Sequence, residues 1–387
     1  MKYDFNTLID RRGTNSVKWD VADGELPMWV ADMDFKAAPE IREALENRLS
    51  HGVFGYNTIP DEWYDAYCGW WGTRHGLDIS REDLVFCTGV IPAISTAVRK
   101  LTTPAEKVLL ETPVYNTFYN SIENNGRYPK ECPLIYEDGE YHRDFEALEE
   151  ALSDPQVSLM ILCNPHNPIG KIWSRAELAK IGELCRRHHV TVISDEIHCD
   201  LTDPNCDYVP FASVSETCRD ISVTCVAPTK TFNIAGMQTA AVIVPNEALR
   251  HKMWRGLNTD EVAEPNSFAI TAAVAAFTRG GEWLDELREY VYKNKLTSAE
   301  FLRRELPEIK LTPSHATYLL WLNISALSHD SVAFAKFVRE KTGLFVSNGA
   351  QYHGNGNEFL RFNIACPRST VIDGLSRLKA AVEAWKE

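Results

Sequence analysis

Three side chains that could take part in catalysis follow apolar runs of the sequence, where strands would end. The first, Lys230, lies between apolar runs at residues 221–226 and 239–244, with Pro228 and Gly236 on either side predicting a turn. A lysine enclosed in this way loses hydration, which disfavours its ammonium form and leaves a nucleophilic amine. Such amines form Schiff bases with carbonyl groups. A lysine that extends to solvent from a surface turn is the alternative interpretation.

Asp195 and Asn167 occupy corresponding positions after two other apolar runs. Asp195 closes residues 190–194, where a carboxylate is costly to bury without a partner. The N–H of a pyridinium ring is one such partner, and a helix N-cap is the other interpretation. Asn167 follows residues 159–163 in the loop N-P-H-N-P-I-G. The prolines and the glycine predict either a rigid loop that points the amide inward or a plain turn.

A fourth run, residues 84–87, leads into T-G-V-I-P and an expected helix from about Ala93. Gly89 would allow the chain to turn, and Pro92 suits the first helical position. The free N–H groups at such a junction can bind phosphate, although an ordinary turn has the same appearance. Together the four strand ends offer a phosphate site, an amide, a carboxylate and an enclosed lysine. This combination predicts a site for pyridoxal 5'-phosphate (PLP).

The elements that must position these residues alternate between short apolar runs and amphipathic stretches. The candidate strands are residues 84–87, 107–110, 159–163, 190–194, 221–226 and 240–244. An amphipathic helix is expected at residues 175–188. Near-continuous apolar strands separated by helices predict a parallel sheet covered on both faces. Ligands of such sheets bind at the carboxyl ends of the strands, which is where the four candidate groups lie.

The C-terminal part of the chain has a different pattern. Helical patterns dominate from residue 265 to 301 and are followed by short expected strands near 318–322, 344–346 and 359–364, then by a closing helix. Mixed elements of this kind predict a smaller α+β domain. We expect an N-terminal arm at residues 1–45 that joins the small domain, a large domain at 46–280 and the small domain at 281–387.

Length and composition are those of an ordinary enzyme. The 387 residues suggest two domains, and apolar and charged residues make up 44% and 24% of the chain. A net charge of −14 without a basic stretch argues against a nucleic-acid partner. The N-terminal sequence has no apolar signal region, and no run is long enough to cross a bilayer. We therefore expect a cytoplasmic protein without a membrane partner.

The cysteines and histidines give no metal-binding pattern. Ten cysteines occur without a C-x-x-C pair, and we expect them to be reduced and packed as small apolar groups. One cluster along the sequence could suggest a metal: His188, His189, His198, Cys199 and Cys206. The expected strand at 190–194 would place the first two at the opposite end from the others. We therefore predict no metal site.

The motifs resemble those of the fold-type I PLP enzymes, the aspartate-aminotransferase superfamily, over nearly the whole chain. Lys230 is similar to the Schiff-base lysine, Asp195 in S-D-E-I-H to the partner of the pyridine nitrogen, and Asn167 to the residue that binds the 3'-oxygen. The resemblance implies an α/β fold with a large mixed, mostly parallel sheet domain and a smaller α+β domain. It assigns cofactor binding to Gly89, Val90, Tyr115, Asn167, Asp195, His198, Thr229, Lys230 and Tyr56.

The same resemblance implies how a substrate binds. Arg361 in F-L-R-F-N-I-A is similar to the arginine that holds the substrate α-carboxylate, a role that suits a bidentate guanidinium. Asn167 and Tyr115 would complete the substrate site, with Tyr115 also stacked on the cofactor ring. Tyr56 in F-G-Y-N resembles a tyrosine that reaches the PLP phosphate of a neighbouring subunit, which implies a homodimer.

A narrower resemblance is to the MalY/PatB group of cystathionine β-lyases, or C–S lyases. It is carried by M-W-V-A-D-M-D-F at residues 28–35, P-T-K-T-F-N-I-A-G and S-D-E-I-H. The sequence itself assigns no role to Asp32 and Asp34. Many relatives have a hydroxyl residue three positions before the lysine, where this chain has Ala227, so phosphate binding would rest more on Thr229 and the Gly89–Val90 backbone.

The resemblance implies α,β-elimination on sulfur-containing L-amino acids, giving a thiol, pyruvate and ammonia, with Lys230 as the base. Cystathionine, cystine, cysteine and other S-conjugates all remain possible substrates. Two alternatives stay open. An aminotransferase would use the same residues but would depend on a keto acid, and a non-catalytic regulatory protein of the same fold would not respond to amino acids.

Overall fold

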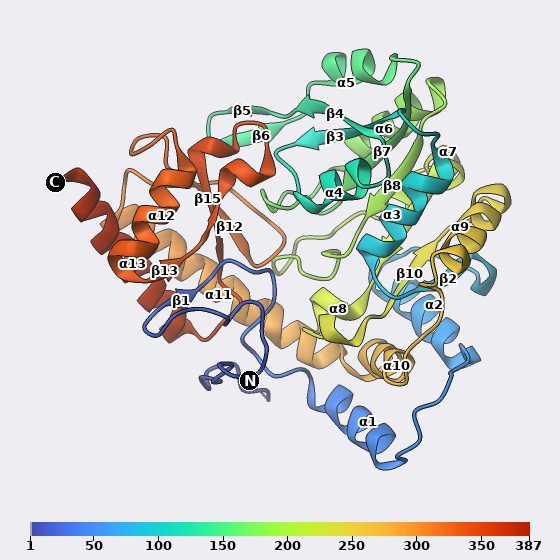
Figure 1. Ribbon diagram of the computed structural model, residues 1–387, viewed down its shortest axis with the longest axis horizontal. Helices are drawn as coiled ribbons and strands as arrows, with labels where there is room; N and C mark the ends of the chain where they lie inside the picture. The colour runs from blue at the N-terminus through green and yellow to red at the C-terminus, as the bar shows by residue number, and fades with distance from the viewer. Residues whose placement is uncertain (1) are drawn as a thin grey trace.

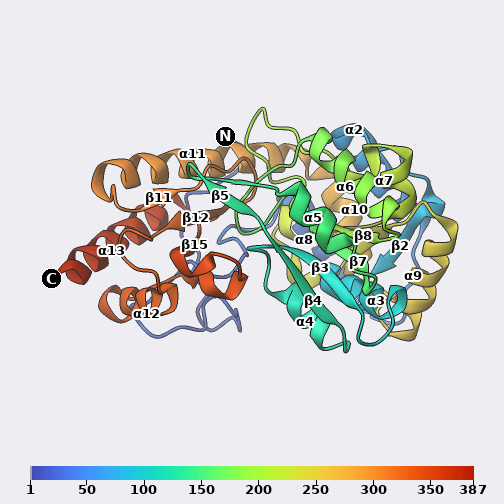
Figure 2. The same ribbon diagram turned by 90° about the horizontal axis from the view of Figure 1, so that it is seen from above.

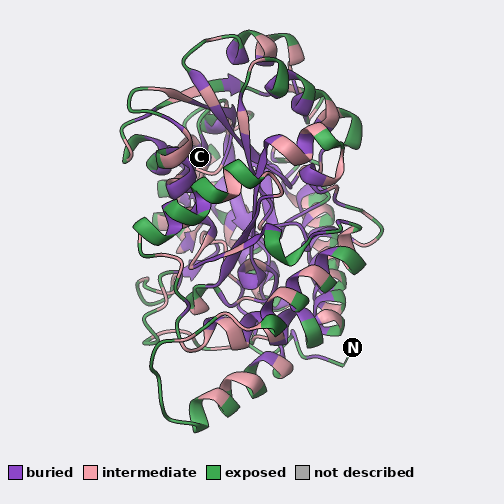
Figure 3. Ribbon diagram, turned by 90° about the vertical axis from the view of Figure 1, so that its right-hand side faces the viewer, coloured by how far each residue is buried: buried purple, intermediate pink, exposed green. Residues whose placement is uncertain are grey.

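The computed structural model describes residues 2–387 and has two lobes, each built around its own β-sheet. In Figure 1 the larger sheet lies to the right and the smaller to the left, and the blue N-terminal chain passes below both. The strands of the large sheet form the buried centre of the molecule, and the outer faces of the helices are exposed (Figure 3).

Seven strands form the large sheet, in the order β2-β10-β9-β8-β7-β3-β4. Their bounds are β2 Leu84–Cys87, β10 Ala240–Ile243, β9 Ser222–Val226, β8 Thr191–Asp195, β7 Val157–Cys163, β3 Lys107–Thr112 and β4 Tyr128–Pro133. From β9 to β4 all neighbours pair in parallel, and β10 runs antiparallel to both β9 and β2. The sheet is therefore mixed and mostly parallel.

Helices cover both faces of this sheet because the strands are apolar on both sides. Against one face pack α3 (Val90–Leu101), α4 (Thr117–Glu123) and α9 (Glu247–Thr259). Against the other pack α5 (Phe145–Leu152), α6 (Arg175–Arg187) and α7 (Glu216–Ile221). At the β2–β10 end, α2 (Asp61–His75) and α10 (Ala269–Arg279) join the core that continues into the small lobe, and α1 (Pro39–Ser50) packs on α10.

The small sheet is antiparallel and has the order β11-β12-β15-β14. Its strands are β11 Lys310–Leu311, β12 Leu319–Asn323, β15 Phe359–Asn363 and β14 Ser347–Asn348. The helices of this part are α11 (Gly281–Glu305), α12 (Ser331–Thr342) and α13 (Arg368–Lys386). Figure 2 shows α11 extending from beside the large lobe along the small one. The N-terminal chain joins the small lobe through β1 (Leu26–Pro27), which pairs in parallel with β13 (Leu344–Phe345).

The remaining elements are short. They are α8 (Pro228–Thr231), the hairpin β5 (Ile135–Glu137) and β6 (Glu140–His142), and the 3-10 turns η1 (Arg81–Asp83), η2 (Phe211–Ser213), η3 (Ala235–Met237), η4 (Gly349–Tyr352) and η5 (Gly356–Glu358). No helix within residues 2–387 is long and apolar enough to cross a membrane. All ten cysteines are free thiols.

Several expectations from the sequence need correction. The segment around Lys230 is the one-turn helix α8 rather than a turn, and α3 begins at Val90 instead of Ala93, which places Pro92 third in the helix. The expected strand at 344–346 pairs with β1 and does not belong to the small sheet. The apolar runs predicted a parallel sheet, whereas strand β10 is antiparallel to its neighbours. The pattern missed this because an apolar run does not encode the direction of its strand.

Candidate active site

A cavity of about 230 Å³ opens where β2, β7 and β8 end. Side chains from several strand ends meet there because parallel strands present their carboxyl ends at one edge of the sheet. Eight of the residues singled out in the sequence line this cavity: Gly89, Val90, Tyr115, Asn167, Asp195, His198, Thr229 and Lys230.

Lys230 projects from α8 toward the N-terminal chain. Its Nζ donates a hydrogen bond of 2.6 Å to the backbone carbonyl of Ala31. Burial lowers the pKa of Lys230 to about 8, and the nearby charge of Arg361 adds to this effect, whereas Asp32 and Asp195 oppose it. A lysine in this environment holds a substantial share of neutral, nucleophilic amine at neutral to mildly alkaline pH.

Asp195 is the last residue of β8 and its side chain is buried. Its Oδ1 accepts a hydrogen bond of 3.1 Å from the backbone N–H of Ile197, so the carboxylate supports a local turn and does not cap a helix. Burial raises the pKa of Asp195 to about 7. A cationic N–H donor placed in the cavity would therefore stabilise the ionised carboxylate.

His198 follows Asp195 by three residues and is also buried. Its Nδ1 has no hydrogen-bond partner among the described residues. Burial lowers the pKa of His198 to about 3, so the ring is neutral, and its edge meets the Tyr318 ring at a centroid distance of 6.2 Å. A neutral imidazole of this kind can exchange a hydrogen bond with a ligand in the cavity.

Arg361 comes from β15 of the small sheet and lies beside the cavity, where it contacts the lining residue Asn167 without lining the cavity itself. Its Nη1 donates to Asn167 Oδ1 at 3.2 Å, and its Nη2 donates to the carbonyl of Trp29 at 2.8 Å. The guanidinium lies over the Tyr352 ring, 5.0 Å from its centroid. These contacts hold a buried guanidinium at the border of the two lobes, where it can bind a carboxylate.

The junction of β2 and α3 forms the anion-binding end of the cavity. No side chain caps the N-terminus of α3, so its first backbone N–H groups are free to bind a ligand. A Cβ atom at Gly89 would lie 3.1 Å from Pro92 Cδ, which leaves little room for a side chain. Thr229 adds a hydroxyl from α8. This end suits a phosphate group.

Two aromatic residues predicted for the site lie in different surroundings. Tyr115 borders the cavity and packs edge-on against Phe118 at 5.6 Å between ring centroids. Tyr56 is fully exposed on the loop between α1 and α2. It is not among the residues that line this chain's cavity.

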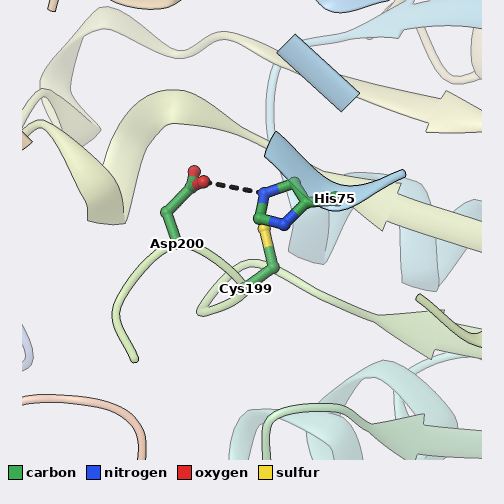
Figure 4. Close-up of side chains that lie close together, drawn as sticks. All are labelled: His75, Cys199 and Asp200. Carbon is green, nitrogen blue, oxygen red and sulfur yellow. Dashed lines mark hydrogen bonds and ion pairs between the residues drawn. The ribbon is translucent and has the colours of Figure 1, made fainter. Parts of the chain in front are cut away.

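A second group of polar side chains lies behind α8. His75, Cys199 and Asp200 bring potential metal-ligand atoms within 4.8 Å of one another (Figure 4). The Asp200 carboxylate accepts hydrogen bonds from Trp70 Nε1 at 3.0 Å and Thr231 Oγ1 at 2.9 Å, and its Oδ1 lies 2.8 Å from His75 Nε2. Burial raises the pKa of the Cys199 thiol well above its ordinary value. The group therefore serves as a hydrogen-bonded link between α2 and α8.

The histidines and cysteines that cluster along the sequence do not cluster in space. His188 and His189 follow α6, and the parallel strand β8 separates them from His198 and Cys199. This is the separation that the apolar run at 190–194 predicts.

The sequence did not reveal three further contributors to the site. The carbonyls of Trp29 and Ala31 accept hydrogen bonds from Arg361 and Lys230, and the Tyr318 hydroxyl donates to Ala31 at 3.0 Å. Residues 28–35 stood out as a motif, but any residue type can accept a hydrogen bond through its backbone carbonyl. The sequence therefore could not indicate these contacts. Tyr318 lay in an expected strand without any signal of its own.

Comparison with known proteins places this geometry in a family. The model for aminotransferase class I and II matches residues 28–378. The chain belongs to the aminotransferase class I and II family. Within it, the chain is 47% identical over 385 residues to cystathionine beta-lyase PatB of Bacillus subtilis (strain 168), covering 98% of this chain and 99% of the relative. It is 35% identical to protein MalY of Escherichia coli (strain K12), covering 99% of each.

Solved structures of similar proteins have the same fold. Cystalysin from Treponema denticola, which contains a pyridoxal 5'-phosphate cofactor, has a TM-score of 0.96 at 34% identity and covers 99% of this chain and 100% of its own. The PLP-bound C-S lyase from Staphylococcus hominis has a TM-score of 0.93 at 33% identity, covering 99% and 98%. The fold-type I architecture expected from the sequence is confirmed.

Proposed function

We propose that this aminotransferase-family chain is a PLP-dependent carbon–sulfur lyase of the cystathionine β-lyase type. The observation that carries the proposal is the cavity lined by Lys230 and Asp195, with Arg361 held beside it on the lining residue Asn167. Full-length similarity to cystathionine beta-lyase PatB and to C–S lyase structures directs the choice of reaction.

The cavity fits PLP at each of its functional groups. The free N–H groups of α3 and the Thr229 hydroxyl would hold the phosphate, and Asn167 and His198 would face the 3'-oxygen side of the ring. Asp195 would accept the pyridine N–H, which supplies the partner that its buried carboxylate needs. Tyr115 would stack on the ring, and the amine of Lys230 would bind the aldehyde carbon covalently.

Arg361 and Lys230 divide the work on the substrate between them. Arg361 would hold the α-carboxylate, while Lys230, released by the incoming amino group, would take the proton from Cα. Bound PLP supplies the electron sink that makes this proton acidic. Loss of the Cβ–S bond then releases a thiol, and the remaining three-carbon fragment reacts with water to give pyruvate and ammonia.

The distal end of the substrate has no assigned partner. Arg361 accounts for the carboxylate, and Asn167 and Tyr115 would complete that side of the site. Cystathionine, cystine and cysteine all fit this scheme, because each carries sulfur on Cβ of an L-amino acid.

We also propose that the active enzyme is a cytoplasmic homodimer. Three apolar side chains of the loop between α1 and α2 are exposed: Val53, Phe54 and Tyr56. Exposed apolar groups on one loop are typical of a contact surface. In a dimer, Tyr56 would reach the phosphate end of the neighbouring cavity.

Keto-acid dependence tests this function against transamination. The holoenzyme is incubated with L-cystathionine, with and without added 2-oxoglutarate, and pyruvate and glutamate are both measured. A lyase releases pyruvate at the same rate in both mixtures. If glutamate forms in the mixture with the keto acid and pyruvate forms in neither, the enzyme is an aminotransferase and the proposal is wrong.

A further inference from the structure

The segment 28–35, called the strap below, joins the two groups that act on the substrate. Its Trp29 carbonyl accepts a hydrogen bond from Arg361 at 2.8 Å, and its Ala31 carbonyl accepts one from Lys230 at 2.6 Å. These two residues come from different lobes. A shift of the strap would therefore change the positions of the Arg361 guanidinium and the Lys230 amine together.

Asparagines from both lobes hold the strap backbone. Asn233, three residues after Lys230, exchanges hydrogen bonds with the N–H and carbonyl of Met33 and donates to the Phe35 carbonyl at 2.8 Å. Asn363, two residues after Arg361, donates to the carbonyls of Val30 at 2.6 Å and Asp32 at 2.7 Å. Each lobe thus holds the strap close to its own functional residue.

A buried group of charges completes this support. Asp34, only 5% exposed, pairs with Lys18 at 2.8 Å and Arg11 at 2.7 Å, and accepts a hydrogen bond from Trp19 Nε1 at 2.8 Å. The same arginine pairs with Asp32 at 2.6 Å. Loss of one carboxylate from such a group leaves a buried charge without its partner, which displaces the chain that carries it.

The cations also bind the strap backbone directly. Arg11 Nη1 donates to the Met33 carbonyl at 3.1 Å, and Lys18 Nζ lies 3.4 Å from the Asp32 carbonyl. The peptide units on both sides of Met33 are therefore fixed by groups that Asp34 holds in place, and Asp32 carries the first of them. Ala31, whose carbonyl meets Lys230, is the next residue along.

We propose that Asp34 is a positioning residue: through Arg11 and Lys18 it fixes the strap so that Trp29 and Ala31 orient Arg361 and the released Lys230. This role deepens the proposed lyase function and rests on it. Asp34 is not among the residues that line the cavity, and it acts through two backbone carbonyls. Asp32, in contrast, acts on Lys230 through its charge.

The test compares Asp34→Asn with Asp203→Asn in the holoenzyme. Asp203 is a matched control, because it also pairs with a buried lysine, Lys295, at 2.5 Å but contacts no part of the strap. Two experiments are done on each variant: the kinetics of pyruvate release, which give kcat and KM, and a titration that gives the Kd of 2-aminoisobutyrate. That probe has the carboxylate and amine of a substrate but no Cα proton, so its affinity reports Arg361 positioning without proton removal or elimination.

For Asp34→Asn we expect the Kd of 2-aminoisobutyrate to rise about tenfold, since one charge-assisted hydrogen bond is worth about that factor. We expect kcat to fall at least as much, because Lys230 loses its alignment. In Asp203→Asn both quantities stay within about twofold of the wild type, although both variants melt at lower temperature. Should Asp34→Asn lower only the melting temperature, the positioning role is wrong.

A milder variant, Trp19→Phe, covers the case in which Asp34→Asn does not fold. It removes one hydrogen bond to Asp34 and keeps an aromatic ring, and we expect the Kd to rise about threefold. An unchanged Kd in this variant would equally overturn the proposal. A wild-type enzyme that binds the probe but releases no pyruvate would contradict the lyase function and leave the Kd test of Asp34 intact.

Discussion

At the scale of single residues, opposite pKa shifts prepare the cavity for a cofactor that brings its own charge. Burial lowers the pKa of Lys230 to about 8 and raises that of Asp195 to about 7. Both shifts favour the neutral forms of these groups. A ligand with an electrophilic carbon near Lys230 can react with the neutral amine, and a cationic N–H near Asp195 stabilises its ionised carboxylate. PLP has both groups.

The pKa of Lys230 predicts how cofactor uptake depends on pH. Only the neutral amine attacks the aldehyde, so the rate at which the apoenzyme binds PLP covalently rises with pH through about 8 and levels off above it. Because the Asp32 charge raises this pKa, Asp32→Asn moves the midpoint to lower pH. Stopped-flow absorbance measures the rate, and a midpoint near that of a solvent-exposed lysine would contradict the account.

Replacing Lys230 removes both of its proposed roles. In Lys230→Ala we expect no absorbance band of lysine-linked cofactor and no measurable pyruvate release. Lys230→Arg is the control for charge, and it should be equally inactive because a guanidinium stays protonated. Turnover in either variant would show that another residue carries the cofactor.

At the scale of elements, the apolar runs predicted most of the large sheet, since buried parallel strands have few other sequence requirements. Strand β4 was missed because five of its six residues keep exposed or partly exposed surface, which hides the apolar signal. Helix α8 was missed because one turn is too short for a periodic pattern. The strap eluded prediction for a different reason: its contacts to Lys230 and Arg361 are made by backbone atoms.

Helix α8 depends on the hydrogen bond from Thr231 to Asp200. In Thr231→Val, one oxygen of a buried carboxylate loses its donor, and we expect the free energy of unfolding to fall by about 1–3 kcal/mol. Urea unfolding measures this change. Thr278→Val, an exposed threonine whose hydroxyl bonds its own helix, is the matched control and should change the free energy far less. Equal effects in the two variants would contradict a supporting role for Asp200.

At the scale of the whole molecule, the site exists because two sheets meet. Asp195 ends strand β8 of the large sheet, Lys230 lies in α8 just after strand β9, and Arg361 comes from β15 of the small sheet. The N-terminal chain contacts both Lys230 and Arg361. We propose that residues 46–280 and 281–387 act as two domains, with residues 1–45 joined to the second. Only the family resemblance predicted that Arg361 and Lys230 lie at the same site, because they are far apart in sequence and no local pattern connects them.

The proposed homodimer makes a separate prediction at this scale. Sedimentation should give twice the chain mass of 43.8 kDa. Tyr56→Phe should raise the Kd of PLP about tenfold through loss of one phosphate hydrogen bond across the interface. Tyr128→Phe, another exposed tyrosine, is the control and should leave the Kd unchanged. A monomer that binds PLP with full affinity would exclude this role for Tyr56.

The central claim is that the assembled site cleaves a carbon–sulfur bond. The most direct measurement follows homocysteine thiol and pyruvate together when the holoenzyme acts on excess L-cystathionine without any keto acid. The account predicts equal amounts of both products over many turnovers. Arrest after a single turnover would contradict it. Loss of the amino group from the substrate without release of a thiol would also contradict it.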